Sequence, residues 1–135
     1  MSGNPGSGGG FDETRPGYEA LAAVADEEFC YLTTTGRVTG LPHEIEIWFA
    51  LISGERTLYL LSGGRDRSDW VKNLKKEARV IIRISSETII GTARFIEGER
   101  EDPTARDLLV EKYERNPGGL AEWRRDSLPV AIDLA

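Results

Sequence analysis

The sequence predicts a mainly β domain in which six antiparallel strands form a small barrel flanked by helices. Six segments rich in β-branched and aromatic residues are separated by turns or helical stretches. Helical patterns occur near the N-terminus, between the third and fourth strands and before the last strand, so most strands follow one another directly. A chain of 135 residues is the size of one domain and can bury a core without disulfides.

The N-terminal part divides into a tail and a short helix. Residues 1–13 are rich in glycine, serine, proline and asparagine, which predicts a disordered tail ahead of a single domain over residues 14–135. Alanine and leucine then predict a helix over residues 18–25.

The next segments predict a β-hairpin. Residues 29–35 (FCYLTTT) form the first strand, and a turn bounded by Gly36 and Gly40 follows. In residues 43–51 apolar positions alternate with Glu44 and Glu46, which predicts a half-buried second strand with a solvated carboxylate face.

The rest of the chain alternates between strands and helices. Trp70, Val71, Leu74 and Ala78 recur at helical spacing after Ser68, a predicted N-cap. Gly91 interrupts a strand and indicates a bulge or a close backbone approach. Asp102 and Pro103 predict the next helix start, with Asp102 as the N-cap. The remaining predicted strands are 57–61, 79–84, 88–97 and 128–134, and the helices are 68–78, 102–116 and 120–126.

Composition excludes several classes of function. A net charge of -6 argues against nucleic acid and anionic membranes as main partners. The chain has a single cysteine, Cys30, so an internal disulfide is impossible, which fits a reducing cytoplasm. We interpret Cys30 as a small buried hydrophobic residue. The lone His43 has no partners at metal-ligand spacing, so no metal site is predicted. No apolar run approaches the length of a membrane-spanning helix.

Two glycine-containing loops carry the groups that bind anions. The first offers Arg37 and Thr39, and the second runs from Ser62, Gly63 and Gly64 through Arg65 and Arg67 to Ser68. The second loop leads into a helix N-terminus, where free N–H groups favour anions, and arginine adds bidentate recognition. Spacing alone leaves two interpretations open, an anion site and a solvated loop that caps a helix.

Longer motifs resemble a known family. The stretches LTTTGRVTGLPHEIEIWF, LYLLSGGRDRSDWVKNLKKEARVIIRI and GTARFIE are similar to the deazaflavin (coenzyme F420)-dependent nitroreductases of the flavin-binding split-barrel superfamily, which includes the pyridoxamine 5′-phosphate oxidases. The resemblance covers residues 20–134. It implies a six-stranded split barrel, a homodimer, and a cofactor near the dimer interface.

The resemblance also assigns cofactor-binding residues. Arg37, Thr39 and His43 match positions that hold the cofactor's phosphate or acidic tail, and Arg67 is a second candidate for the tail. Ser62, Gly63 and Gly64 match the loop beside the ring system, and Trp70 and Asn73 match the helix that closes the pocket. Many relatives carry a lysine at the position of Val38 and an arginine at that of His43.

The resemblance implies an oxidoreductase in which reduced F420 supplies a hydride to a quinone, nitroaromatic or enone. No catalytic side chain is assigned, and Tyr31, Trp48 and Tyr59 are candidates for the substrate side. An FMN-dependent oxidoreductase is the alternative, although Trp70 stands about where the oxidase branch has a lysine. The sequence is also compatible with a non-catalytic module that binds flavin or haem, with His43 as the haem ligand, and with a dimeric scaffold.

Overall fold

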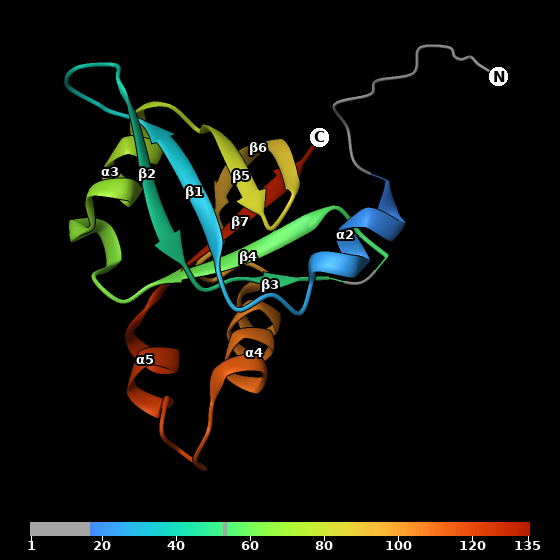
Figure 1. Cartoon of the computed structure of the whole chain (residues 1–135). Coiled ribbons are helices and arrows are strands. Elements are labelled where there is room, and N and C mark those ends of the chain that lie inside the picture. The colour runs from blue at the N-terminus through green and yellow to red at the C-terminus, as the bar shows by residue number, and fades with distance from the viewer. Residues whose placement is uncertain (1–16, 53) are drawn as a thin grey trace, which may run out of the picture.

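The computed structural model describes residues 17–52 and 54–135, so the predicted tail lies outside the described residues. Four helices and one 3₁₀ turn surround the sheet of the described chain (Figure 1). Helix α3 lies beside the β1–β2 hairpin, and α4 and α5 lie together at one end of the sheet. None of the described helices is long and apolar enough to cross a membrane. The elements are α2 (Tyr18–Val24), η1 (Arg65–Arg67), α3 (Asp69–Lys76), α4 (Asp102–Tyr113) and α5 (Ala121–Asp126).

The described strands form one antiparallel sheet in the order β2-β1-β5-β6-β7-β4-β3. Strands β2 and β3 occupy its two edges, yet only Trp48 and Phe49 separate them in the chain. Because so short a link spans roughly 10 Å, the sheet must curl until its edges approach each other, as in a split barrel. The strands are β1 (Cys30–Thr35), β2 (Pro42–Ile47), β3 (Ala50–Leu51), β4 (Thr57–Ser62), β5 (Arg79–Ile84), β6 (Glu87–Phe95) and β7 (Leu128–Leu134).

The structure confirms the mainly β fold and corrects the strand count from six to seven among the described residues. The predicted strand 43–51 breaks after Ile47, where the chain leaves one edge for the other. The backbone N–H of Phe49 donates to the Tyr113 hydroxyl (3.1 Å) instead of to a strand. Lys112 donates to the Phe49 carbonyl (3.0 Å). Helix α4 therefore satisfies the backbone groups that the break would leave unpaired.

The hairpin forms as predicted and brings its turn over α3. Strands β1 and β2 pair in register from Cys30 opposite Ile47 to Thr35 opposite Pro42. Between them the Gly36 N–H donates to the Leu41 carbonyl (2.7 Å). The turn residue Gly40 has φ +76°, a conformation that glycine adopts at little cost. The strand pairing therefore fixes the position of the loop that carries Arg37.

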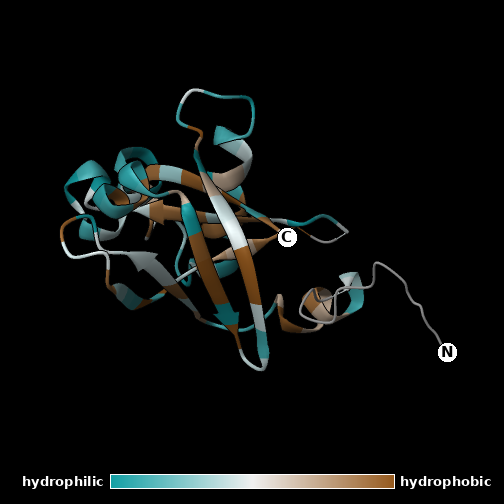
Figure 2. Ribbon diagram, turned by 90° about the horizontal axis from the view of Figure 1, so that it is seen from above, coloured by the Kyte–Doolittle hydropathy of each residue, from teal (hydrophilic) through white to brown (hydrophobic). Residues whose placement is uncertain are grey.

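Two apolar clusters stabilise the fold, one inside the curled sheet and one between the sheet and helix α4. Apolar and polar residues alternate along the strands in Figure 2, which matches the alternation of buried and exposed positions. Cys30 lies fully buried in the first cluster. Burial raises the pKa of its thiol to about 12, so the thiol stays protonated, as expected of a small buried hydrophobe.

The start of helix α4 differs from the prediction in its N-cap. Glu101 takes the N-cap position, and Asp102 is the first helical residue. The Asp102 carboxylate accepts from the Gly98 N–H (2.8 Å) and from Arg106 Nε (2.5 Å). The aspartate therefore fixes the loop before the helix instead of capping the helix.

Gly91 lies in β6 beside strand β7, where little space is left for a side chain. A Cβ atom at this position would lie 2.5 Å from Ile132 Cγ2 and 3.2 Å from the Asp133 carbonyl. The structure therefore confirms the close approach that the sequence indicates.

We expect Gly91→Ala to lower the free energy of unfolding by about 1–3 kcal/mol, because the added methyl group must displace a well-packed neighbour. Thr92→Ala, at the adjacent exposed position of β6, is the matched control, with an expected change below about 0.5 kcal/mol. Urea denaturation of both variants measures the difference. Equal stabilities of Gly91→Ala and the unchanged protein would contradict the prediction.

Candidate functional site

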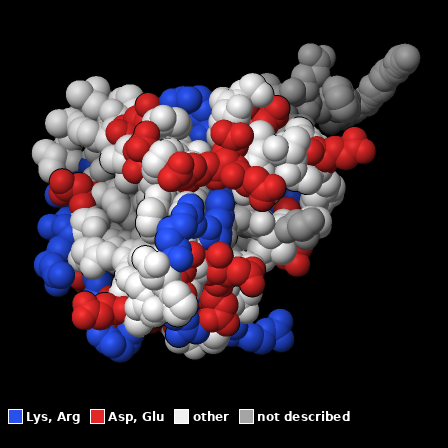
Figure 3. Space-filling model, turned by 60° about the horizontal axis from the view of Figure 1, so that its bottom comes forward, with Lys and Arg blue, Asp and Glu red and all other residues white. Residues whose placement is uncertain are grey.

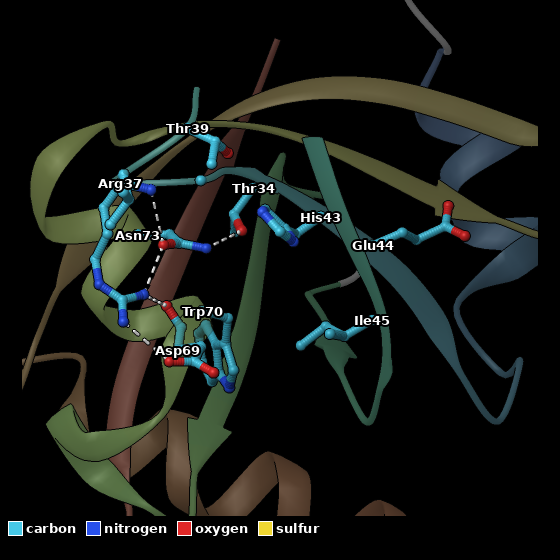
Figure 4. Close-up of a pocket in the computed structure, with 11 residues that line it drawn as sticks. Thr34, Arg37, Thr39, His43, Glu44, Ile45, Asp69, Trp70 and Asn73 are labelled. Carbon is cyan, nitrogen blue, oxygen red and sulfur yellow. Dashed lines mark hydrogen bonds and ion pairs between the residues drawn. The ribbon is translucent and has the colours of Figure 1, made fainter. Parts of the chain in front are cut away.

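A cavity of about 430 Å³ opens between the β1–β2 hairpin and helix α3. Five residues that the resemblance assigns to the cofactor line it, from the hairpin loop, strand β2 and α3 (Figure 4). They are Arg37, Thr39, His43, Trp70 and Asn73. The hairpin motif and the helix motif, 33 positions apart from Arg37 to Trp70, therefore belong to the same site.

Arg37 joins the hairpin loop to α3. Its guanidinium donates to Asn73 Oδ1 (2.9 Å) and pairs with the Asp69 carboxylate (3.1 Å). Lys76 Nζ donates to the Arg37 carbonyl (3.0 Å). Because Asp69, Asn73 and Lys76 recur at helical spacing, one stripe of α3 holds Arg37 of the loop. The Nε–H of Arg37 donates to none of the described residues.

Asn73 is a buried bridge between the two elements. Its Nδ2 donates to Thr34 Oγ1 (3.0 Å), and its Oδ1 accepts from both the backbone and the side chain of Arg37. A buried amide must find partners for its donors and acceptors, and here both ends are satisfied. Asn73 of α3 thus positions Arg37 of the hairpin loop.

Trp70 and His43 form opposite walls of the cavity. Trp70 is half-buried and packs against the first core cluster while it also lines the cavity. His43 lies so close to Gly36 that a Cβ there would meet its Nε2 at 2.6 Å. Glu44, the neighbour of His43, also lines the cavity, but its carboxylate extends away from Arg37 in Figure 4 and pairs with Arg83 (3.5 Å). Its carboxylate lies on an exposed face, as predicted.

The second predicted loop does not line this cavity. Ser62 donates to the Arg65 carbonyl (2.9 Å) and shares a hydrogen bond with the Ser68 hydroxyl (2.8 Å). Ser68 occupies the N-cap position, but its side chain makes no capping hydrogen bond. Arg65, at φ +53°, binds both carboxylate oxygens of Glu97 (2.6 Å each). The serines therefore shape the turn, and Gly63, Gly64 and Arg67 are likewise outside the lining residues of the cavity.

The three aromatic candidates for the substrate side have different surroundings. Tyr31 donates to Glu46 (3.0 Å) and lies under Arg83. Tyr59 is buried and donates to Glu101 (2.7 Å). Trp48 lines a second cavity of about 470 Å³. Of the three, only Trp48 lines either of these two cavities.

Sequence reasoning missed two contributors to the first site. Asp69, in the first turn of α3, was not among the predicted site residues, yet its carboxylate pairs with Arg37 inside the cavity lining. Lys76 was not singled out. The i, i+4 and i+7 spacing of Asp69, Asn73 and Lys76 predicts that they share one face of the helix. The spacing does not show that this face contacts Arg37, because that depends on where the hairpin packs.

A family model described as F420H(2)-dependent quinone reductase matches residues 17–134. The chain belongs to this family. F420-dependent oxidoreductases of this family use reduced coenzyme F420, which confirms the deazaflavin prediction and favours F420 over FMN. Family membership also favours an enzyme over a non-catalytic module or a scaffold. No match to the chain was found among curated proteins.

Solved structures support the same family and its fold. A structure described as an F420-H2 dependent reductase (FDR-A) is 25% identical, with a TM-score of 0.62 over 81% of this chain and 95% of that chain. A proposed pyridoxamine 5′-phosphate oxidase from Listeria innocua is 16% identical, with a TM-score of 0.63 over 87% and 92%. A structure described as a domain-swapped dimer is 25% identical, with a TM-score of 0.64 over 82% and 81%. The split-barrel fold is thereby confirmed.

One face of this F420-dependent reductase carries both positive and negative side chains. On the face shown in Figure 3, basic and acidic side chains are interspersed. This face has no extended basic stripe of the kind that nucleic-acid backbones require. Arg37 and Lys76 are two cations beside the first cavity that suit an anionic cofactor.

Proposed function

We propose that this F420-dependent reductase binds reduced F420 in the cavity between the hairpin and α3 and reduces a quinone, nitroaromatic or enone substrate. The observation that carries the proposal is the cavity itself. Its walls bring together the two motifs by which the chain resembles the family.

The residues present fit an anionic group. Arg37 keeps its Nε–H free of described partners, and the Thr39 oxygen accepts from the Leu41 N–H (3.2 Å), which leaves the hydroxyl proton available. A guanidinium and a hydroxyl suit a phosphate or carboxylate. Lys76 adds a second positive charge next to Arg37. These groups offset the absence of a cation at Val38, which is 88% exposed at the hairpin tip.

Each wall of the cavity has a distinct role in the proposal. Arg37, Thr39 and His43 would hold the phosphate or acidic tail, and Arg67 could meet a tail that extends beyond the cavity. Trp70 and Ile45 offer apolar surface, and Asn73 fixes Arg37. Backbone N–H groups of Ser62, Gly63 and Gly64 would face the polar edge of the ring, as the resemblance implies. Bound reduced F420 would supply the hydride, while the protein provides position and electrostatics.

Turnover tests this proposal. Oxidised F420 fluoresces and its reduced form does not, so a rise in fluorescence after addition of menadione reports hydride transfer. We expect a rate that is proportional to protein concentration and saturates with menadione. A rate no greater than that of the same mixture without protein would overturn the proposal.

The Asp69 carboxylate weakens the binding of an anion at Arg37 for two reasons. It already forms an ion pair with the guanidinium, and it adds negative charge to the cavity lining. We therefore expect Asp69→Asn to tighten F420 binding by roughly 3- to 10-fold, the equivalent of about 0.6–1.4 kcal/mol. Fluorescence titration at low ionic strength measures the change. Asp107→Asn, which removes an exposed carboxylate on α4, is the control. Weaker binding by Asp69→Asn would contradict the prediction.

We also infer a homodimer in a reducing cytoplasm. Ile81 and Ile90 lie opposite each other across β5 and β6 and are both exposed, and an apolar pair of this kind suits a protein contact. One 25% identical structure is described as a domain-swapped dimer. Sedimentation equilibrium tests the dimer directly, and a monomer at micromolar concentration would refute it.

The inference of a reducing cytoplasm is supported by Cys30, which is a free, buried thiol.

A further inference from the structure

The loop between β4 and α3 has a backbone conformation that its sequence does not favour. Arg65 has φ +53°, in the left-handed region, where the Cβ atom of any residue except glycine causes strain. Neither Gly63 nor Gly64, which stand just before it, takes a positive φ. Strain of this kind persists only where the surrounding structure fixes the residue. Contacts of the Arg65 side chain should therefore account for the conformation.

The guanidinium of Arg65 makes four hydrogen bonds to groups from two other parts of the chain. Its Nη2 donates to both carboxylate oxygens of Glu97 (2.6 Å each), in the turn after β6. Its Nη1 donates to the carbonyls of Asp126 (3.0 Å) and Ser127 (3.1 Å), at the end of α5. Hydrogen bonds with a charged donor or acceptor are about twice as strong as neutral ones, so these contacts offset the strain and fix the loop.

A second arginine ties the same groups to helix α4. Arg106 is buried, and its Nε donates to the carboxylate of Asp102 (2.5 Å). Its Nη1 donates to the carbonyl of Arg124 in α5, and its Nη2 pairs with Glu97 (3.8 Å). The carboxylate of Glu97 therefore lies between two guanidinium groups, one from the loop and one from α4.

Helix α5 is held by these arginines and by an aromatic contact. It has six residues, none of them buried, and so short a helix is not stable alone. The carbonyls of residues 124–127 accept from the two arginines, and positive charge is favourable at this end of a helix. Trp123 meets Trp48 edge-on with ring centroids 5.6 Å apart, and Trp48 stacks on Tyr113. Trp123 also lies against Gly63, where a Cβ atom would be 3.4 Å from its Cδ1. The loop and α5 therefore contact each other directly as well as through the guanidinium.

We propose that Arg65 is a positioning residue, which holds residues 62–68 in the conformation that binds F420 and couples this conformation to the position of α5. The inference rests on the proposed function, in which backbone N–H groups of this loop face the polar edge of the cofactor ring. Arg65 does not line the first cavity, and both of its Nη atoms are directed at Glu97 and α5. It therefore acts on the cofactor through the loop and not by contact.

Two glutamate variants test the positioning role. Glu97→Gln removes the charge between Arg65 and Arg106 and should weaken F420 binding roughly 3- to 10-fold in a fluorescence titration. If Arg65 instead contacted the anionic cofactor directly, the loss of a competing carboxylate would tighten binding. Glu111→Gln, at an exposed position of α4, should leave the Kd unchanged. Tighter binding by Glu97→Gln, or a Kd equal to that of Glu111→Gln, would overturn the inference.

A stability control separates the positioning of the loop from a general loss of folding. Arg65→Ala removes the guanidinium but keeps a residue that resists a positive φ, so it should weaken F420 binding roughly 10-fold. Arg65→Lys keeps the charge and should have an intermediate Kd. Gly91→Ala is also expected to lower stability but leaves the contacts of the loop intact, so its Kd should stay within about 2-fold of the unchanged protein's value. Equal Kd values for Arg65→Ala and Gly91→Ala would overturn the inference.

Amide hydrogen exchange measures the coupling without F420. The N–H groups of Arg67 and Ser68 donate to carbonyls within the loop (3.0 and 3.5 Å), and the N–H of Ser127 donates to the carbonyl of Trp123 in α5 (3.0 Å). In Glu97→Gln, exchange should rise roughly 3- to 10-fold in residues 66–68 and in residues 124–127 together. Exchange in the β1–β2 hairpin should not change.

The two measurements distinguish failure of the inference from failure of the proposed function. If the unchanged protein neither binds F420 nor reduces menadione, the proposed function fails, while a joint rise in exchange would still support the coupling of the loop to α5. A rise in only one of the two segments, or in neither, would overturn the inference. If F420 binds and menadione is reduced but Glu97→Gln behaves like Glu111→Gln, the inference alone fails.

Discussion

Replacing Arg37 with alanine is expected to weaken F420 binding by roughly 10- to 100-fold, which corresponds to a loss of about 1.4–2.8 kcal/mol for a charge-assisted contact. Two effects combine in this variant. The guanidinium that faces the cavity is lost, and the hairpin loop loses its contacts with Asp69 and Asn73. Fluorescence titration of oxidised F420 measures the Kd.

Two further variants show which effect dominates. Arg37→Lys keeps the charge but loses the planar fork, so its affinity should fall between those of the alanine variant and the unchanged protein. Arg115→Ala, which removes an exposed arginine beyond the end of α4, should bind F420 normally. An affinity of Arg37→Ala equal to that of Arg115→Ala would exclude Arg37 from the cofactor site.

Tyr113 should be the most costly single position for stability among the residues around the second cavity. Tyr113→Ala removes the ring that stacks on Trp48, and we expect a loss of about 3–5 kcal/mol in the free energy of unfolding. Tyr113→Phe keeps the stack but leaves the buried Phe49 N–H without its acceptor, at an expected cost of about 1–3 kcal/mol. Urea denaturation measures both values.

Tyr18→Phe provides the matched control, because Tyr18 is exposed and lies on α2. We expect this variant to change stability by less than about 0.5 kcal/mol. If Tyr113→Phe is as stable as Tyr18→Phe, the hydroxyl does not hold the break between β2 and β3.

Local sequence patterns predicted most of the fold. The alternation in β1 and β2, the short glycine-bounded turn and the helical stripe of α3 each describe contacts between near neighbours. The break at Trp48 and Phe49 could not be predicted in this way, because the alternation continues through both residues. It depends on Tyr113, 64 residues further along the chain.

The candidate site was predicted in part. Arg37, His43, Trp70 and Asn73 line one cavity, and the family motifs alone brought them together. The contacts of Asp69 and Lys76 with Arg37 could not be predicted from the sequence, because they form only when the hairpin packs on α3. Whether Ser62, Gly63, Gly64 and Arg67 contact a bound cofactor stays a prediction.

Trp70 belongs both to the edge of the core and to the lining of the cavity. It packs against the core and lines the cavity, so its position on the apolar stripe does not exclude contact with a ligand. At the same position a lysine would suit the phosphate of FMN, as the resemblance to the oxidase branch implies. An indole there offers no charge to that phosphate.

Parallel titrations of the purified protein with F420 and FMN test the central claim most directly. We expect saturable quenching by F420, with a Kd at least about 10-fold below that for FMN, and loss of the F420 signal in Arg37→Ala. Tighter binding of FMN, or no saturable binding of F420, would contradict the account.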